Sequence, residues 1–226
     1  MIPPGLDRDR GKTLRAPVIL GLLGEEIPDA VIALHYRNTW ELLLVTILSA
    51  QTTDKLVNVV SPSLFARWPG PQELAGANLA DIEQAVARLG FFRQKAKNIQ
   101  GCARAVLTDH GGEVPATMEE LLTLPGVARK TANVVLSNGF GDNQGVVVDT
   151  HIGRLARRLA FTKHTDPVKV EKDLMRLFSR EDWLRVADLL IHHGRRTCDA
   201  QRPRCDDCVI EPLCPSSQVA GRRDRR

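Results

Sequence analysis

An all-α fold is the fold class that the sequence predicts, from three observations. Apolar residues recur at helical spacing in several segments, as at Ile82, Val86 and Leu89. Ser, Thr, Asn or Asp residues precede many of these segments and Pro or Gly residues follow them, which are the start and stop signals of helices. No long segment alternates apolar and polar residues in the manner of a half-buried strand, and no repeat of about 20 to 50 residues is present.

The first strongly marked helix begins at Asn38. Asn38 to Glu41 has the form of a capping box, and apolar residues follow to about Ala50. Because this segment is apolar on almost every side, we expect it to be buried in the core of a domain. Before it, residues 1–16 are expected to form a mobile basic arm and residues 17–36 two short helices.

Other predicted boundaries are a break at Ser61-Pro62, a capped start at Thr117, a helix from Asp166 to about Phe178 and one from Ser179 to Gly194.

The composition is that of a mildly basic protein with enough apolar residues for one large or two modest domains. The 226 residues are 43% hydrophobic and carry a net charge of +4, which is compatible with nucleic acid but not diagnostic of it. Aromatic residues make up only 4%, which argues against broad base-stacking platforms. The longest apolar run, Leu42 to Leu48, is broken by Thr46 and is far shorter than the roughly 20 residues of a membrane span. We expect a cytoplasmic protein without a signal peptide or membrane partner.

Four of the five cysteines lie close together near the C-terminus. They are Cys198, Cys205, Cys208 and Cys214, whereas Cys102 stands alone and is expected to pack as a small apolar residue. In a cytosolic chain such a cluster favours a metal site over a disulfide framework. Four thiolates can hold either a zinc ion or an iron–sulfur cluster, and the spacing alone leaves both open.

The segment from Leu121 to Leu136 predicts two helices joined by a tight turn. Gly126 follows a proline and permits a backbone conformation that other residues resist. The start of the second helix would then offer free N–H groups to a phosphate of any nucleotide, with Arg129 adding positive charge. An ordinary helical hairpin with a Pro-Gly turn is the alternative.

Two ionisable residues follow this turn. Lys130 lies on the first turn of the second helix beside Arg129, where the positive surroundings favour the neutral amine that a Schiff-base nucleophile requires. Asp149 precedes another helix and is well placed to be its N-cap. Lys130 could equally be a solvated surface lysine, and the capping role of Asp149 does not exclude a catalytic one.

A basic segment without acidic residues runs from Gln84 to Thr108 and is a candidate phosphate-facing edge. A solvated helix face is the alternative. Its basic residues are Arg88, Arg93, Lys95, Lys97 and Arg104.

The motifs together resemble the endonuclease III family of DNA glycosylases. The resemblance covers about residues 30 to 215, in the order of the family's motifs. The matching segments are 48–54 (LSAQTTD), 95–99 (KAKNI), 124–136 (LPGVARKTANVVL), 148–152 (VDTHI), 191–194 (IHHG) and the spacing Cys-x6-Cys-x2-Cys-x5-Cys.

This resemblance implies a helix-hairpin-helix glycosylase fold of two helical domains with a DNA cleft between them. The expected domains are a six-helix barrel at residues 32–143, which contains the hairpin, and a cluster domain made of residues 1–31 and 144–226. It also implies that the four cysteines hold a [4Fe–4S] cluster rather than zinc. The arginines that flank them, and at most nonspecifically the basic tail at 222–226, would add contacts to DNA.

The implied activity is removal of oxidised pyrimidines from duplex DNA by a monomer, followed by strand cleavage 3′ to the abasic site. Lys130 would be the nucleophile and Asp149 the essential acid. Lys130 distinguishes the chain from the adenine glycosylases of the superfamily, and the four cysteines distinguish it from most 8-oxoguanine glycosylases. A noncatalytic DNA-binding module is the competing hypothesis. The DNA-binding residues implied are Gln51, Phe91, Gly126, Ala128, Arg129 and His151.

Two of these positions depart from the family pattern. Phe91 stands where the family has a leucine that wedges into DNA, and an aromatic side chain can serve the same purpose. Ala128 replaces the second glycine of the hairpin, where a methyl group would hinder the approach of a phosphate. We therefore expect the departures to affect the range of lesions and the efficiency more than the type of reaction.

Overall fold

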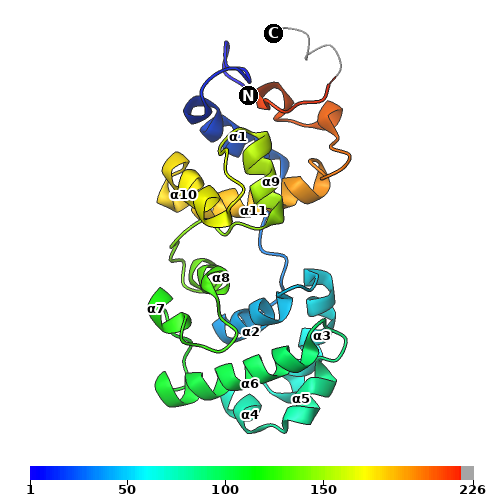
Figure 1. The fold of residues 1–226 in the computed structure, drawn as a ribbon, viewed down its shortest axis with the longest axis vertical. Helices are drawn as coiled ribbons and strands as arrows, with labels where there is room; N and C mark the ends of the chain where they lie inside the picture. The colour runs from blue at the N-terminus through cyan, green and yellow to red at the C-terminus, as the bar shows by residue number, and fades with distance from the viewer. Residues whose placement is uncertain (220–226) are drawn as a thin grey trace. The chain divides into compact units, whose positions relative to one another are not determined.

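The computed structural model describes residues 1–219 and confirms the all-α prediction, since no strand occurs in that part of the chain (Figure 1). The basic tail at 222–226 lies outside the described residues. Within the described part, no helix is both long and apolar enough to cross a membrane. The α-helices are α1 Lys12–Glu26, α2 Thr39–Ser49, α3 Asp54–Arg67, α4 Pro71–Gly76, α5 Leu79–Ala85, α6 Phe92–Asp109, α7 Met118–Leu121, α8 Arg129–Gly139, α9 Thr150–Arg158, α10 Pro167–Leu177 and α11 Trp183–Arg196.

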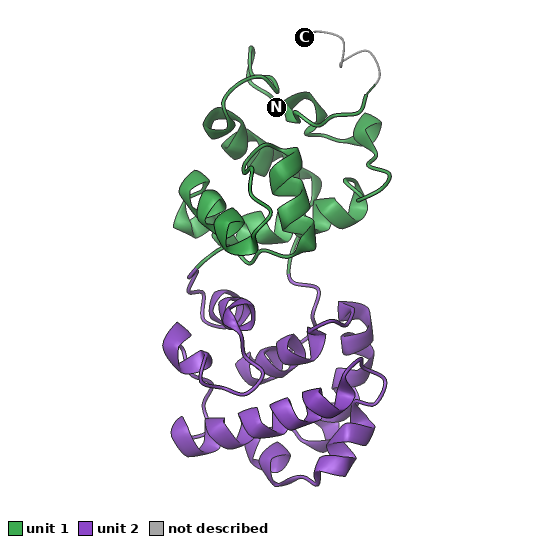
Figure 2. Cartoon of the chain, in the orientation of Figure 1, with its two compact units in different colours: residues 1–31, 145–226 green, residues 32–144 purple. Residues whose placement is uncertain are grey.

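The chain divides into two compact units (Figure 2). Unit 1 consists of residues 1–31 and 145–226, of which 1–31 and 145–219 are described, and unit 2 consists of residues 32–144. The chain returns to unit 1 after Gln144, at the end of the polar loop that follows α8. The roles of these units as a barrel domain and a cluster domain stay predictions.

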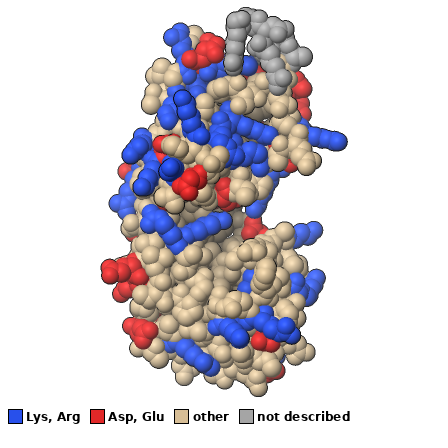
Figure 3. Space-filling model, in the orientation of Figure 1, with Lys and Arg blue, Asp and Glu red and all other residues tan. Residues whose placement is uncertain are grey.

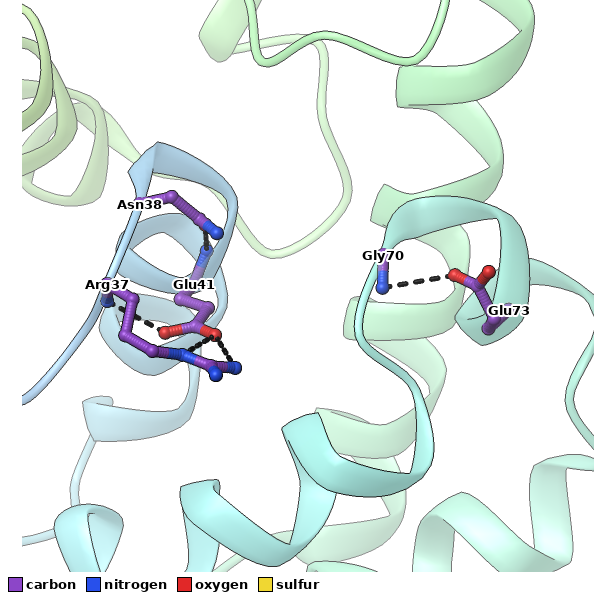
Figure 4. A network of polar contacts seen from close by, with 5 residues as sticks. All are labelled: Arg37, Asn38, Glu41, Gly70 and Glu73. Atoms are coloured by element: carbon purple, nitrogen blue, oxygen red, sulfur yellow. Dashed lines mark hydrogen bonds and ion pairs between the residues drawn. The ribbon is translucent and has the colours of Figure 1, made fainter.

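Helix α2 is the centre of the core of unit 2. Every residue from Trp40 to Leu48 is buried, and α3, α6 and α8 pack against the helix, as its uniformly apolar sequence predicts. Asn38 caps it by accepting a hydrogen bond from the N–H of Glu41 at 2.9 Å. The buried Glu41 carboxylate accepts from the backbone N–H and guanidinium of Arg37, not from the N-cap itself, whereas Glu73 in α4 does accept from its N-cap, Gly70, at 3.1 Å (Figure 4).

Unit 1 has a separate core formed by α1, α9, α10 and α11. Phe161 and Phe178 belong to this core, with their rings edge to face and their centroids 5.6 Å apart. Asp149 caps α9 and Asp166 caps α10, each by accepting a backbone N–H, so both predicted starts are confirmed.

The N-terminal prediction is wrong. Residues 12–26 form one helix that runs through Pro17, in place of a mobile arm and two short helices. Arg15 is only 2% exposed, and its guanidinium donates to the carbonyl oxygens of Leu159 and Leu213 at 3.0 and 2.9 Å. These distant acceptors compensate for burying the charge, and local sequence gives no sign of them.

Two predicted helix boundaries are also wrong. Pro62 lies inside α3 because Ser61 and Leu64 are buried on either side of it, and this packing outweighs the roughly 3 kcal/mol cost of an interior proline. Gly194 lies inside α11, which continues to Arg196. There the glycine gives room to α9, since an added Cβ would lie 3.1 Å from the Arg154 guanidinium and 3.2 Å from Leu155.

Candidate functional site

The turn between α7 and α8 requires glycine at Gly126 for two separate reasons. Its φ is +82°, in the left-handed region that favours glycine. In addition, a Cβ at this position would lie 2.9 Å from the Cβ of Asn98 on α6. Leu124 and Val127 are buried on either side and anchor the turn to the core of unit 2.

Helix α8 begins directly after this turn. Its N-cap, Ala128, has φ −101° and ψ 171°, which is extended backbone that any residue adopts, and its side chain provides no cap. The first N–H groups of the helix therefore lack an N-cap side chain as a partner. Lys130 is the second residue of α8 and is exposed, and its ammonium group has no hydrogen-bond or ion-pair partner within residues 1–219.

Two further turns of unit 2 contain residues in the left-handed region. Gln51 follows α2 with φ +53°, and Phe91 precedes α6 with φ +57° and is 69% exposed. Within the described chain, the only other non-glycine residue with positive φ is Ala160. A Cβ on Gly90 would lie 3.8 Å from the carbonyl oxygen of Gln51, so these two turns are neighbours. Strained backbone of this kind is concentrated at functional sites.

In unit 1, Asp149 and His151 begin α9. One carboxylate oxygen of Asp149, Oδ1, accepts the N–H of Ile152 at 2.8 Å. The half-buried His151 has Nδ1 3.2 Å from the guanidinium of Arg154. The same guanidinium donates to the carbonyl oxygens of Gly194 and Cys198 at 3.0 and 3.1 Å, which connects this helix to the first cysteine of the C-terminal group.

The four C-terminal cysteines line one cavity in unit 1, together with apolar side chains that include Leu155, Leu159 and Ile210. All four are free thiols. Burial raises the pKa of Cys208 to about 12, and it also raises the pKa of Cys214. Four thiols in a largely apolar cavity are suited to a bound cation that stabilises their thiolate forms.

In the part of the chain that the structure describes, no three His, Cys, Asp or Glu side chains are close enough together to hold a metal ion. Arg158 of α9 also faces the cavity, with its guanidinium 3.1 Å from the sulfur of Cys198.

Comparison with known proteins now decides the family. Residues 44–180 match the family model described as HhH-GPD superfamily base excision DNA repair protein. Endonuclease III of Synechocystis is 50% identical over 209 residues, which cover 92% of this chain and 95% of that protein. The chain belongs to the endonuclease III family. Endonuclease III of Escherichia coli is 38% identical over 196 residues, covering 87% of this chain and 92% of that enzyme.

Solved structures of endonuclease III have the same fold. A trapped covalent intermediate of endonuclease III with DNA has a TM-score of 0.85 and 39% identity, over 91% of this chain and 96% of that one. A non-covalent complex of endonuclease III with DNA has a TM-score of 0.86 and 38% identity, over 95% and 99%.

The structure groups some of the residues that the endonuclease III motifs single out and separates others. Gln51 and Phe91 lie on neighbouring turns, and Gly126, Ala128 and Arg129 follow one another in the hairpin. Lys130 belongs to unit 2, whereas Asp149, His151 and the cysteines belong to unit 1.

The candidate basic edge needs a correction, because Lys95 is only 4% exposed and does not belong to it. Arg88, Arg93, Lys97 and Arg104 are exposed, although Arg93 stacks on Phe92 and Arg104 donates to the carbonyl oxygen of Ala75. Figure 3 shows many further Lys and Arg side chains on the surface of unit 1. The exposed arginines next to the cysteines are Arg195, Arg196, Arg202 and Arg204.

Sequence reasoning missed three supporting residues. Asn98 packs against Gly126, Arg158 contacts Cys198, and Lys95 donates to Thr52. Lys95 and Asn98 both lie in the KAKNI segment, so the motif itself was the available signal.

Proposed function

We infer that this protein is a base excision repair DNA glycosylase with AP lyase activity, which removes oxidised pyrimidines from duplex DNA. One observation supports this more than any other. A chain of the endonuclease III family has both an exposed lysine, Lys130, at the start of α8 and a carboxylate, Asp149, at the start of α9. The relative that was trapped covalently on DNA supports the same type of chemistry.

In the proposed reaction the target nucleotide first leaves the duplex. The neutral amine of Lys130 attacks C1′, the bond from C1′ to the base breaks, and the base leaves with the bonding electrons and takes up a proton. Ring opening gives a protonated imine between Lys130 and C1′. Loss of a proton from C2′ then expels the 3′ phosphate, and water releases the lysine. Asp149 would accept the proton that the ammonium loses and stabilise positive charge on the sugar.

The remaining residues would bind and distort the DNA. The N–H groups at the start of α8, from Ala128 and Arg129, would bind a backbone phosphate next to the turn at Gly126. Gln51 and Phe91 would fill the space that the flipped base leaves, and His151 would contact the DNA backbone. We place this activity on chromosomal DNA in the cytoplasm, with the protein as a monomer.

We also propose that Cys198, Cys205, Cys208 and Cys214 hold a [4Fe–4S] cluster. The four cysteines line one cavity, and only Cys205 and Cys208 form a Cys-x-x-Cys unit, which suits a polynuclear group better than a zinc site built from two such units. The cluster would supply a structural link between α9 and the C-terminal loop. Iron and sulfide analysis of purified protein tests this: about four of each per chain are expected, and a colourless protein that contains zinc would refute the assignment.

Borohydride trapping on abasic DNA distinguishes the lyase from a noncatalytic DNA-binding module. Reduction of the imine should give a covalent adduct with the wild type and none with Lys130→Ala. Lys55→Ala is the matched control, since it removes an exposed lysine from the same unit and should still give the adduct. A wild type that forms no adduct rules out the lyase, and base release without strand cleavage would indicate a monofunctional glycosylase.

A further inference from the structure

The buried lysine of the KAKNI segment has no part in the chemistry above. Lys95 is the fourth residue of α6, and its Nζ donates to the hydroxyl of Thr52 at 2.5 Å. Thr52 lies 43 positions earlier in the chain, in the turn after α2, directly next to Gln51. Lys95 also donates its own backbone N–H to the carbonyl oxygen of Phe91 at 3.0 Å. One residue thus has a hydrogen bond to each of the two turns.

This position is unfavourable for a lysine. Burial lowers the pKa of Lys95, because the ammonium form loses its hydration. The first turn of a helix is also the positive end of its dipole, which repels a cation. Among the described residues, the Thr52 hydroxyl is the one hydrogen-bond acceptor of Nζ. If the site served only to fill space in the core, an unbranched apolar side chain such as methionine would do so without these costs.

The two turns that Lys95 joins are the ones with strained backbone. Gln51 and Phe91 both have positive φ, and residues persist in that region when their surroundings hold them there. Gly90 allows the turns to approach, since a Cβ there would lie 3.8 Å from the Gln51 carbonyl oxygen and 3.9 Å from the Thr52 hydroxyl. The hydrogen bond from Lys95 to Thr52 runs between these neighbouring turns and therefore fixes their separation.

We propose that Lys95 is a positioning residue that ties the turn at Gln51 to the turn at Phe91 and sets the spacing of the two side chains that enter DNA. This proposal rests on the proposed function, in which those side chains fill the gap left by the flipped base. A damaged base that is still stacked must be extruded, whereas an abasic nucleotide has no base to unstack. Loss of the tie should therefore slow base release more than strand cleavage at a ready-made abasic site.

The test uses the full chain with Lys95→Met, which keeps length and removes the donor, and Thr52→Val, which removes the acceptor. Single-turnover rates are measured for base release from thymine glycol DNA and for cleavage of preformed abasic DNA. Each rate is expressed per active molecule, with the active fraction counted by borohydride trapping. A 2-aminopurine opposite the lesion reports unstacking by its fluorescence. Lys55→Met controls for the loss of one positive charge in the same unit.

Lys95→Met should slow base release on the order of 10- to 100-fold, the usual effect of a displacement near 1 Å. Abasic cleavage should stay within about threefold of wild type, and the 2-aminopurine signal should fall, because unstacking is the step affected. The double variant should be no slower than the slower single variant, since both remove one interaction. Lys55→Met should leave the ratio of the two rates unchanged.

The proposal is overturned if Lys95→Met releases the base at a rate within about twofold of wild type, because a displaced side chain should slow this step far more. Equal slowing of both reactions would also overturn it, because Lys95 would then act on folding or on chemistry. The proposed function fails in a different way, through a wild type that releases no base and forms no adduct. If Gln51→Ala and Phe91→Ala leave base release unchanged, the positioning of these side chains has no consequence and the proposal is wrong.

Discussion

Substitution of Gly126 by alanine tests the account of the hairpin turn quantitatively. Left-handed backbone costs an alanine about 1–2 kcal/mol. The new methyl group would lie 2.9 Å from the Asn98 Cβ, and overpacking of this kind costs about 1–3 kcal/mol. The smaller entropy of the unfolded chain offsets about 0.4–1 kcal/mol. We expect a net loss of about 1–5 kcal/mol in the free energy of unfolding.

Gly141 provides a matched control for the backbone contribution. Its φ is +69° and no atom lies within 4 Å of an added Cβ, so Gly141→Ala should incur only the backbone cost. Urea unfolding followed by tryptophan fluorescence measures both variants, since Trp40 and Trp68 report on unit 2. Asn98→Gly, which removes the contacting Cβ, should partly restore Gly126→Ala in the double variant. The reasoning is refuted if Gly126→Ala is no less stable than Gly141→Ala.

Three other predictions follow from single residues. Ala128→Gly should strengthen binding to duplex DNA at low salt in a fluorescence anisotropy titration, because it removes the methyl group next to the phosphate site, and unchanged affinity would show that this methyl group is harmless. Asp149→Asn keeps a good N-cap, so it should unfold like wild type while its rate of base release falls on the order of 10²- to 10⁴-fold. Asp149→Ala should show the same loss of activity and also lose about 1 kcal/mol of stability. Equal stability of the two variants would count against the capping role. Burial raises the pKa of Asp188 to about 7 from 3.8, so the contribution of its neutral carboxyl to stability is present below pH 4 and is lost as the pH rises toward 7. The urea midpoint of Asp188→Asn should therefore exceed that of wild type at pH 8 but not at pH 4. A difference between the two midpoints that does not change with pH would contradict this.

Local interactions were predictable from the sequence and distant ones were not. Asn38, Asp149 and Asp166 act on N–H groups within three residues, so their capping roles can be read from neighbouring positions. Arg15 and Lys95 look like ordinary basic surface residues, and only acceptors far along the chain account for their burial. The breaks expected at Pro62 and Gly194 failed for the same reason, because packing from other helices decides those positions.

One face of α6 supports every element of unit 2 that we assign to DNA. Phe91 is its N-cap, Lys95 holds the turn at Gln51, Asn98 packs against Gly126, and a Cβ on Gly101 would lie 3.3 Å from Pro125. These positions are three or four residues apart, which places them in one row along the helix. The hairpin turn and the turns at Gln51 and Phe91 therefore all contact α6. Motion of α6 would move these three turns together, whereas a change at Lys95 would move the turn at Gln51 relative to the other two.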